Sequence, residues 1–85
     1  MEVAYSSKAL EDIDYWKETD NKKIQEKITQ LIEDIQSHPS TGIGKPEPLK
    51  HALAGKWSRK IDKKHRVIYA IKVNILYIYS LKKHY

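Results

Sequence analysis

The chain has 85 residues, a length that suits one domain without a linker or a second module. Hydrophobic residues make up 40% of it and cysteine is absent, so we expect one modest core and exclude disulfides and thiolate metal sites. No apolar run reaches the length of a membrane span, and the first residues lack the pattern of a signal peptide. The sequence therefore predicts a single domain, residues 1–85, in the cytoplasm and not in a membrane.

Charge is segregated along the chain, although the formal net charge is only +5. Residues 1–40 hold five lysines against nine acids, a net of −4, whereas residues 41–85 hold eleven Lys and Arg against two acids, a net of +9. This asymmetry indicates a basic face suited to a polyanion, most simply nucleic acid. The alternative is that dispersed lysines only keep a small protein soluble.

The first half of the chain predicts a short strand at residues 2–5 and two helices. Ser6 or Ser7 can cap the first helix, and Asp20 or Asn21 the second. The first helix has an apolar stripe of Ala9, Leu10, Ile13 and Trp16, and a polar side of Glu11, Asp12, Asp14 and Glu18. The second has a stripe of Ile24, Ile28, Leu31, Ile32 and Ile35, and Pro39 ends it. Their short connection predicts an antiparallel hairpin.

Residues 39–48 form a loop by composition, and the period then changes to two. Residues 57–61 alternate, with Trp57, Arg59 and Ile61 on one face, and two more strands follow at residues 66–71 and 75–81. The connectors between these strands are short, which favours an antiparallel meander. The fold class is therefore α+β: an N-terminal strand and a two-helix hairpin packed on one face of an antiparallel sheet.

Three features in the basic half could carry chemistry. Glu47 lies between two prolines, which hold its backbone rigidly, and the surrounding positive charge suits a general base. Arg66 opens a strand and could contact phosphate. At the chain end, the His84 imidazole could donate a proton and the Tyr85 ring could stack on a base. The alternatives are an exposed turn glutamate, a surface ion pair and an ordinary frayed tail.

Other kinds of site are not indicated. The four histidines have no cysteine partners and no helical i, i+4 pairing, so we expect no structural metal. The segment from Gly42 to Gly44 lacks the spacing of a phosphate-binding loop, and we expect no cofactor.

Several short segments together resemble the YoeB toxins of the RelE superfamily. They are Tyr15–Asp20, Lys45–His51, Trp57–Ile61, His65–Tyr69 and the terminal His84-Tyr85, and they span essentially the whole chain. The resemblance implies a RelE-like, microbial-RNase-like fold and a type II toxin that cleaves mRNA in the ribosomal A site. It implies that Glu47 is the general base, that Arg66 stabilises the phosphate, and that His84 and Tyr85 are the acid and the stacking ring. The RNA would be held by Lys50, Arg59, Lys82 and Lys83.

The resemblance also implies partners: an antitoxin of the YefM type with an acidic tail, the 70S ribosome with its mRNA, operator DNA for the toxin–antitoxin complex, and a second copy of the chain. Two departures stand out, because Lys60 and Lys82-Lys83 differ from the usual family residues. Two other functions stay open. One is a RelE-fold toxin that binds DNA gyrase without cleaving RNA, and the other is a basic nucleic-acid-binding module without catalysis.

Overall fold

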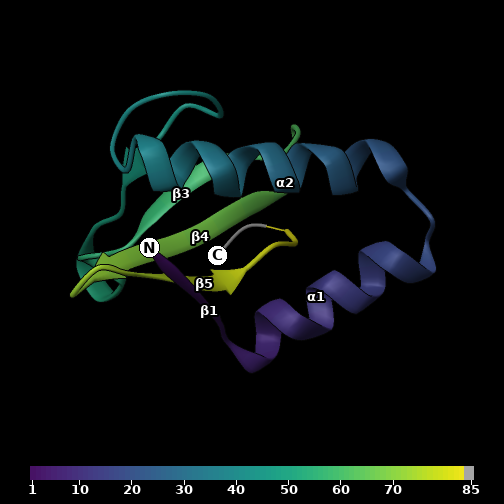
Figure 1. The fold of residues 1–85 in the computed structure, drawn as a ribbon, viewed down its shortest axis with the longest axis horizontal. Coiled ribbons are helices and arrows are strands. Elements are labelled where there is room, and N and C mark those ends of the chain that lie inside the picture. Colours follow the sequence, from purple (N-terminus) through teal and green to yellow (C-terminus); the bar gives the residue numbers. More distant parts are fainter. Residues whose placement is uncertain (84–85) are drawn as a thin grey trace.

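Two helices pack on a five-stranded mixed sheet (Figure 1). The structure is a computed structural model, and it describes residues 1–83. The helices are α1 (Ser7–Glu18) and α2 (Lys22–Ser37), with a short 3-10 turn, η1 (His51–Leu53). The strands are β1 (Glu2–Tyr5), β2 (Glu47–Pro48), β3 (Trp57–Lys60), β4 (Arg66–Lys72) and β5 (Ile75–Ser80). The predicted α+β class is confirmed.

The sheet has the order β1-β5-β4-β3-β2. The pairs formed by β2, β3, β4 and β5 are antiparallel, as the short connectors predict. β1 pairs parallel with β5, so the sheet is mixed and not purely antiparallel. Parallel neighbours need a long crossover connection, and here the two helices and three other strands lie between β1 and β5 in the sequence.

Both helices begin at caps that the sequence offers. The Ser6 side chain accepts a hydrogen bond from the Ala9 amide at 3.0 Å, and Asn21 accepts one from the Ile24 amide at 3.1 Å. α2 buries most of its predicted stripe, namely Ile24, Ile28, Leu31 and Ile35. None of the helices within residues 1–83 is long and apolar enough to cross a membrane.

The apolar stripe and the polar side predicted for α1 are each wrong at one position. Leu10 is 52% exposed, whereas Asp12, which the pattern places on the polar side, is only 3% exposed. Ala9 and Trp16 are buried as predicted. The buried carboxylate has partners far away in the sequence, described below.

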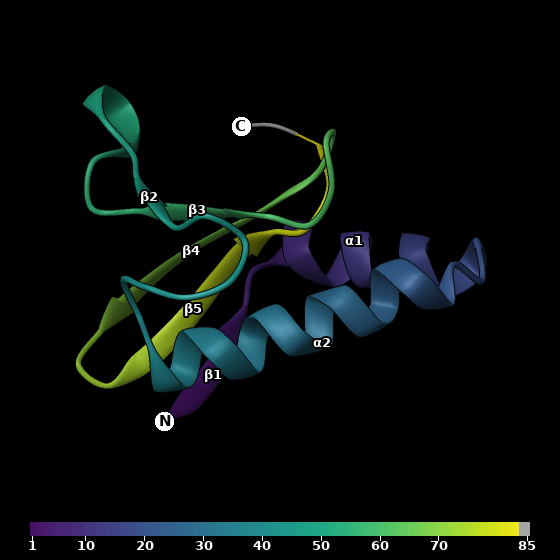
Figure 2. The same ribbon diagram turned by 90° about the horizontal axis from the view of Figure 1, so that it is seen from above.

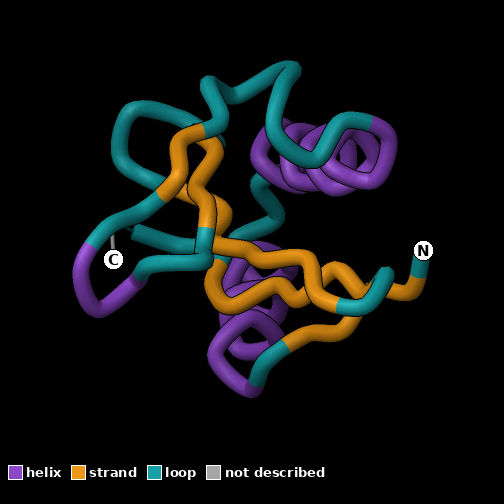
Figure 3. Tube along the Cα trace, turned by 90° about the vertical axis from the view of Figure 1, so that its left-hand side faces the viewer, coloured by secondary structure: helices purple, strands orange, loops and turns teal. Residues whose placement is uncertain are grey.

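The core lies between the helices and one face of the sheet. Strand alternation directs Val67, Tyr69, Leu76 and Ile78 into it, each at most 1% exposed. Figure 2 shows both helices on one side of the sheet. Figure 3, seen along α2, shows η1 on the side of the sheet away from that helix. The opposite face, which we call the open face, is therefore built largely from the basic half of the chain.

Candidate active site

Strand register places Glu47 and Arg66 on the open face. Glu47 pairs with Ser58, and Ser58 pairs with Ile68, so these three residues share one side of the sheet. Arg66 precedes Ile68 by two residues on the same strand and faces the same way. Two strand spacings and one pleat repeat put the Cα atoms of Glu47 and Arg66 roughly 12 Å apart. The Glu47 side chain is exposed and that of Arg66 is half-buried, whereas Ser58 and Ile68 between them are only 4% and 3% exposed.

Glu47 lies on a short strand at the sheet edge. The predicted loop, residues 39–48, is therefore wrong for its last two residues, which form β2. Pro46 and Pro48 favour extended backbone on both sides of Glu47, which suits a two-residue strand. The Leu49 amide then donates to the Lys56 carbonyl at 2.9 Å and closes the excursion that contains η1. A shallow depression of about 300 Å³ beside the strand is lined by Glu47, Pro48, Leu49, Lys50 and His51. The Glu47 and Lys50 side chains are exposed there.

A tight turn presents Arg66. The Asp62 carboxylate accepts hydrogen bonds from the amides of Lys64 at 2.8 Å and His65 at 2.7 Å. Partial burial opposes ionisation, but these amides and the nearby cationic side chains leave the pKa of Asp62 below its ordinary value. Arg66 Nη1 donates to the carbonyls of Asp62 at 2.9 Å and His65 at 3.1 Å. The guanidinium is therefore held against the turn from which its strand starts.

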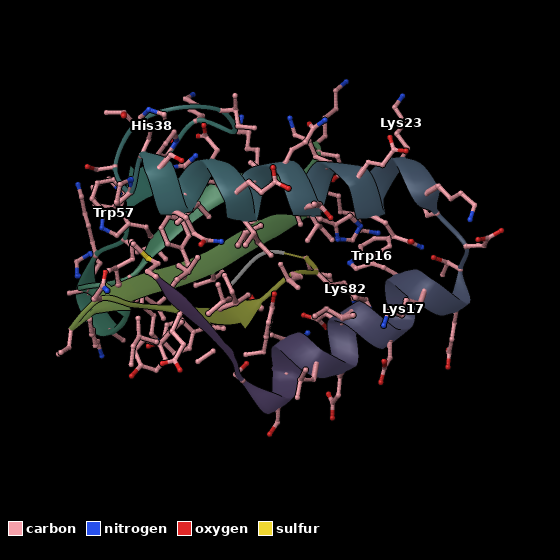
Figure 4. The ribbon with its side chains drawn as sticks, in the orientation of Figure 1. Trp16, Lys17, Lys23, His38, Trp57 and Lys82 are labelled. Carbon is pink, nitrogen blue, oxygen red and sulfur yellow. The ribbon has the colours of Figure 1, made fainter. Side chains whose placement is uncertain are left out.

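The end of the described chain lies beside Arg66. The Arg66 amide donates to the Lys83 carbonyl at 3.2 Å, and the Lys83 amide donates to His65 Nδ1 at 2.7 Å. Lys82 turns toward the helical side, where its ammonium lies 3.8 Å from the centre of the Tyr15 ring (Figure 4). The predicted acid and stacking ring, His84 and Tyr85, lie outside the described residues. Their roles stay predictions, as do those of Lys50, Lys82 and Lys83.

The prediction that Arg59 holds RNA is wrong, because its side chain is 0% exposed and faces the helices. Nη1 donates to the Asp34 carboxylate at 2.5 Å and to the Ile43 carbonyl at 3.1 Å. Nη2 donates to the carbonyls of His38 and Thr41, and Nε to the Tyr69 hydroxyl at 3.1 Å. All three nitrogens of the guanidinium are therefore engaged within the protein.

This network fastens the loop that leads to Glu47. The hydrogen bond from Arg59 holds the pKa of Asp34 below its ordinary value. Burial raises the pKa of Tyr69, whose hydroxyl stays protonated and donates to the Pro39 carbonyl at 2.9 Å. Gly42, at φ +115°, passes so close that an added Cβ would lie 2.1 Å from Asp34 Oδ2. Arg59 thus serves the site indirectly, by fixing residues 38–43.

Two tyrosines on the open face were not singled out from the sequence. Tyr77 and Tyr79 stack at 6.5 Å with an interplanar angle of 22°, and the Lys56 ammonium lies 4.3 Å from the centre of the Tyr79 ring. Both rings are half-buried. The alternation in residues 75–80 was the available signal, because it directs both rings away from the core residues Leu76 and Ile78.

Other parts of the described chain offer less chemistry. Within residues 1–83, no group of three or more His, Cys, Asp or Glu is placed to hold a metal ion. A groove between α1 and α2 has a volume of about 240 Å³, and the side chains that line it include one charged group, Lys17. A lone ammonium in a mainly apolar groove does not make an acid–base pair. The open face remains the candidate site.

Comparison with known proteins gives the same answer from sequence and from fold. Residues 5–85 match the family model of the YoeB-like toxin of bacterial type II toxin-antitoxin systems. Toxin YoeB of Escherichia coli strain K12 is 46% identical over 85 residues, which cover the whole of both chains. The YoeB/ParE toxin from Agrobacterium tumefaciens superposes with a TM-score of 0.96 at 34% identity, again over the whole of both chains.

Solved structures of Staphylococcus aureus proteins are also similar. A YoeB–YefM complex contains a chain with a TM-score of 0.89 and 40% identity, and a YoeB dimer has a TM-score of 0.89 at 38% identity. Each match covers 100% of this chain and 98% of the other. The fold and these likenesses define the toxin component of a bacterial type II toxin–antitoxin system. Within that class, the chain belongs to the YoeB family.

Proposed function

We propose that the chain is an endoribonuclease that cleaves mRNA in the ribosomal A site and thereby inhibits translation. The observation that carries this proposal is the register of β2, β3 and β4, which puts a carboxylate and a guanidinium, Glu47 and Arg66, on the face opposite α1 and α2. The backbone hydrogen bond from Arg66 to Lys83 holds Lys83, the last described residue, beside Arg66. A toxin that only occupies DNA gyrase has no need of this combination.

The chemistry follows from the residue types and needs no metal in any step. Glu47 takes the proton from the ribose 2′-OH, whose oxygen attacks the adjacent phosphorus. Arg66 stabilises the negative charge that accumulates on the phosphate oxygens. The bond from phosphorus to the 5′-oxygen breaks, and His84 supplies the proton to that oxygen. The products are a 2′,3′-cyclic phosphate and a 5′-hydroxyl, while Tyr85 stacks on a base and holds the substrate.

The charge distribution supports the RNA partner and the antitoxin alike. Residues 41–85 carry a net of +9, which favours a polyanion such as mRNA on the ribosome. Lys50 and Lys83 are exposed near Glu47 and Arg66 respectively, where they attract phosphate. By analogy with the YoeB–YefM complex of Staphylococcus aureus, an antitoxin of the YefM type with an acidic tail would mask the same surface. A second copy of the toxin and operator DNA bound by the toxin–antitoxin complex are further proposed partners, and the cytoplasm is the proposed location.

The variant Glu47→Gln tests the general base. It keeps the volume and polarity of the side chain and removes its capacity to accept a proton. Single-turnover cleavage on ribosomes programmed with a defined mRNA should slow by about 10²–10⁴-fold, with ribosome affinity within about twofold of wild type.

Glu2→Gln, an exposed substitution on β1 at the opposite edge of the sheet, is the matched control and should cleave normally. A normal rate for Glu47→Gln would remove Glu47 from the mechanism. Inhibition of gyrase supercoiling without any mRNA cleavage by the wild-type protein would favour the gyrase-binding alternative instead.

A further inference from the structure

Helix α1 holds both backbone polar groups of Leu81, the residue that follows β5. The Asp12 carboxylate accepts a hydrogen bond from the Leu81 amide at 2.9 Å, and Trp16 Nε1 donates to the Leu81 carbonyl at 2.9 Å. All three residues are buried, with exposed fractions of 3% for Asp12, 5% for Trp16 and 0% for Leu81. The end of the last strand is therefore fixed by two side chains that lie more than sixty residues earlier in the sequence.

Two residues further on, the chain is held a second time. The Lys83 amide and carbonyl are bonded to His65 and to the Arg66 amide, as described above. Trp16 connects the two attachment points, because its ring meets the His65 ring edge-on with 4.8 Å between centroids. Lys83 adopts a φ of +64°, a left-handed conformation that a non-glycine residue adopts rarely, so the surrounding contacts must hold it.

A third contact joins α1 to the same segment. The Lys82 ammonium lies over the Tyr15 ring, and Figure 4 shows Lys82 beside Trp16 where α1 meets the end of β5. Asp12 also forms an ion pair on its own helix, since Lys8 Nζ lies 2.5 Å from its other oxygen. A carboxylate this buried is costly unless it is paired and hydrogen-bonded. Both of its oxygens have partners here: one is the Lys8 ammonium and the other is the Leu81 amide.

We propose that Asp12 and Trp16 are positioning residues for RNA cleavage: they anchor residues 81–83 and so hold Lys83 beside Arg66. This inference rests on the proposed function, in which the last two residues supply the acid and the stacking ring. Two residues of extended chain span at most about 7 Å. A role for the last two residues next to Arg66 therefore requires that Lys83 stay where its carbonyl accepts the Arg66 amide. Helix α1, on the helical side of the sheet, controls chemistry on the open face.

The alternative is that these hydrogen bonds only stabilise the fold, and kinetics separate the two. Trp16→Phe keeps an aromatic ring in the core and removes the indole donor. Asp12→Ala removes the acceptor for the Leu81 amide, whereas Asp12→Asn retains a carbonyl oxygen that can accept it. Ile28→Val is the control for a general loss of stability. It shortens a buried side chain of α2 that forms no hydrogen bond with residues 81–83.

The experiment is single-turnover mRNA cleavage on programmed ribosomes at increasing ribosome concentration, well below the unfolding temperature of every variant. The maximal rate should fall about 10²-fold for Trp16→Phe and Asp12→Ala, because misplacement by about 1 Å costs that much. The half-saturating ribosome concentration should stay within about twofold of wild type. Asp12→Asn should recover most of the rate, and Ile28→Val should match wild type. Hydrogen exchange of the Leu81 amide gives a readout apart from activity, and it should accelerate in Asp12→Ala.

Each outcome bears on one claim. Faster exchange at Leu81 with a normal maximal rate would overturn the positioning role and leave the proposed function standing. Equal rate losses in Ile28→Val would assign the effect to stability and overturn it as well. A wild-type protein that fails to cleave mRNA would contradict the proposed function itself. If Asp12→Ala does not fold, Trp16→Phe and Asp12→Asn still decide the question.

Discussion

Arg59 and Arg66 lie on neighbouring strands, β3 and β4, and face opposite sides of the sheet. Arg59 pairs with Val67 and points toward the helices, where it is fully buried among an aspartate, a tyrosine and three backbone carbonyls. Arg66 pairs with Lys60 and points to the open face, half-buried against the carbonyls of its own turn. The same residue type is a structural clamp in one place and a candidate for phosphate binding in the other.

The difference shows that the face of the strand decides what a guanidinium does. Arg59 shares its face with Trp57 and Ile61, both directed to the core, so its charge must be satisfied inside the protein. Arg66 shares its face with Ser58 and Glu47, and of these three residues Glu47 is exposed and Arg66 half-buried, so a ligand can reach both of them. Basic residue type alone would assign both arginines to RNA. Register separates them.

Replacing each arginine by methionine should separate the two roles, because one variant should lose stability and the other should lose activity. Arg59→Met should lower the free energy of unfolding by about 3 kcal/mol, because it leaves a carboxylate and several buried carbonyls without their donor. Arg66→Met should change it by about 1 kcal/mol or less and should instead slow single-turnover mRNA cleavage by about 10²-fold. Both variants should be measured by urea unfolding and by mRNA cleavage on programmed ribosomes. Arg59→Met should show the larger loss of stability, and Arg66→Met should cleave slowly although it is stable.

Lys60→Met is the control for loss of a positive charge on β3, since Lys60 is exposed and neighbours Arg59 in sequence. Its unfolding should stay close to wild type. A loss of stability as small for Arg59→Met as for Lys60→Met would show that the buried network contributes little. A normal cleavage rate for Arg66→Met would contradict its role in stabilising the phosphate.

Acid should reduce the stability that the Arg59–Asp34 pair gives to the folded protein. The pKa of Asp34 is lowered in the folded protein, chiefly by its hydrogen bond with Arg59, from an ordinary value of 3.8. A folded pKa below the unfolded one stabilises the protein above the unfolded pKa, and this contribution is lost as the pH falls through the folded value. The free energy of unfolding should therefore be steady near neutrality and fall below about pH 4.

Urea unfolding between about pH 3 and pH 7 for wild type and Asp34→Asn measures this contribution. The gap between the two proteins should be widest near neutral pH and should narrow in acid. Asp62→Asn sharpens the comparison, because the pKa of Asp62 is also lowered but its carboxylate serves the turn before Arg66. We expect a smaller gap there. A gap for Asp34→Asn that does not change with pH would contradict the assignment.

Much of the fold could be predicted from local patterns. Helical and strand periodicity indicated both helices and four of the five strands, and Ser6 and Asn21 are caps that the sequence offered. β2 escaped prediction because two residues carry no period, and the parallel pairing of β1 depends on a partner some seventy residues away. The exposure of Leu10 likewise depends on which part of α1 the sheet covers, and local spacing does not contain that information.

The candidate site was predictable where residue type and strand face agreed. Glu47 and Arg66 fall on the open face as alternation requires. Alternation also placed Arg59 with Trp57 and Ile61, and the RNA assignment failed because it followed charge and ignored that face. Asp12 was missed for another reason. Its hydrogen bond to Leu81 spans 69 positions, and no helical pattern shows that a carboxylate will be buried by such a partner.

Attack by the ribose 2′-OH is the central step of the proposed mechanism, and one substrate tests it. Wild-type protein is mixed with ribosomes carrying an mRNA that has a single 2′-deoxynucleotide immediately 5′ of the scissile phosphate, alongside the all-ribose mRNA. DNA and RNA differ at that site only in the hydroxyl whose oxygen must attack the phosphorus. We predict normal cleavage of the all-ribose mRNA, leaving a 2′,3′-cyclic phosphate, and no cleavage of the deoxy-substituted one. Cleavage of both at equal rates would contradict the mechanism.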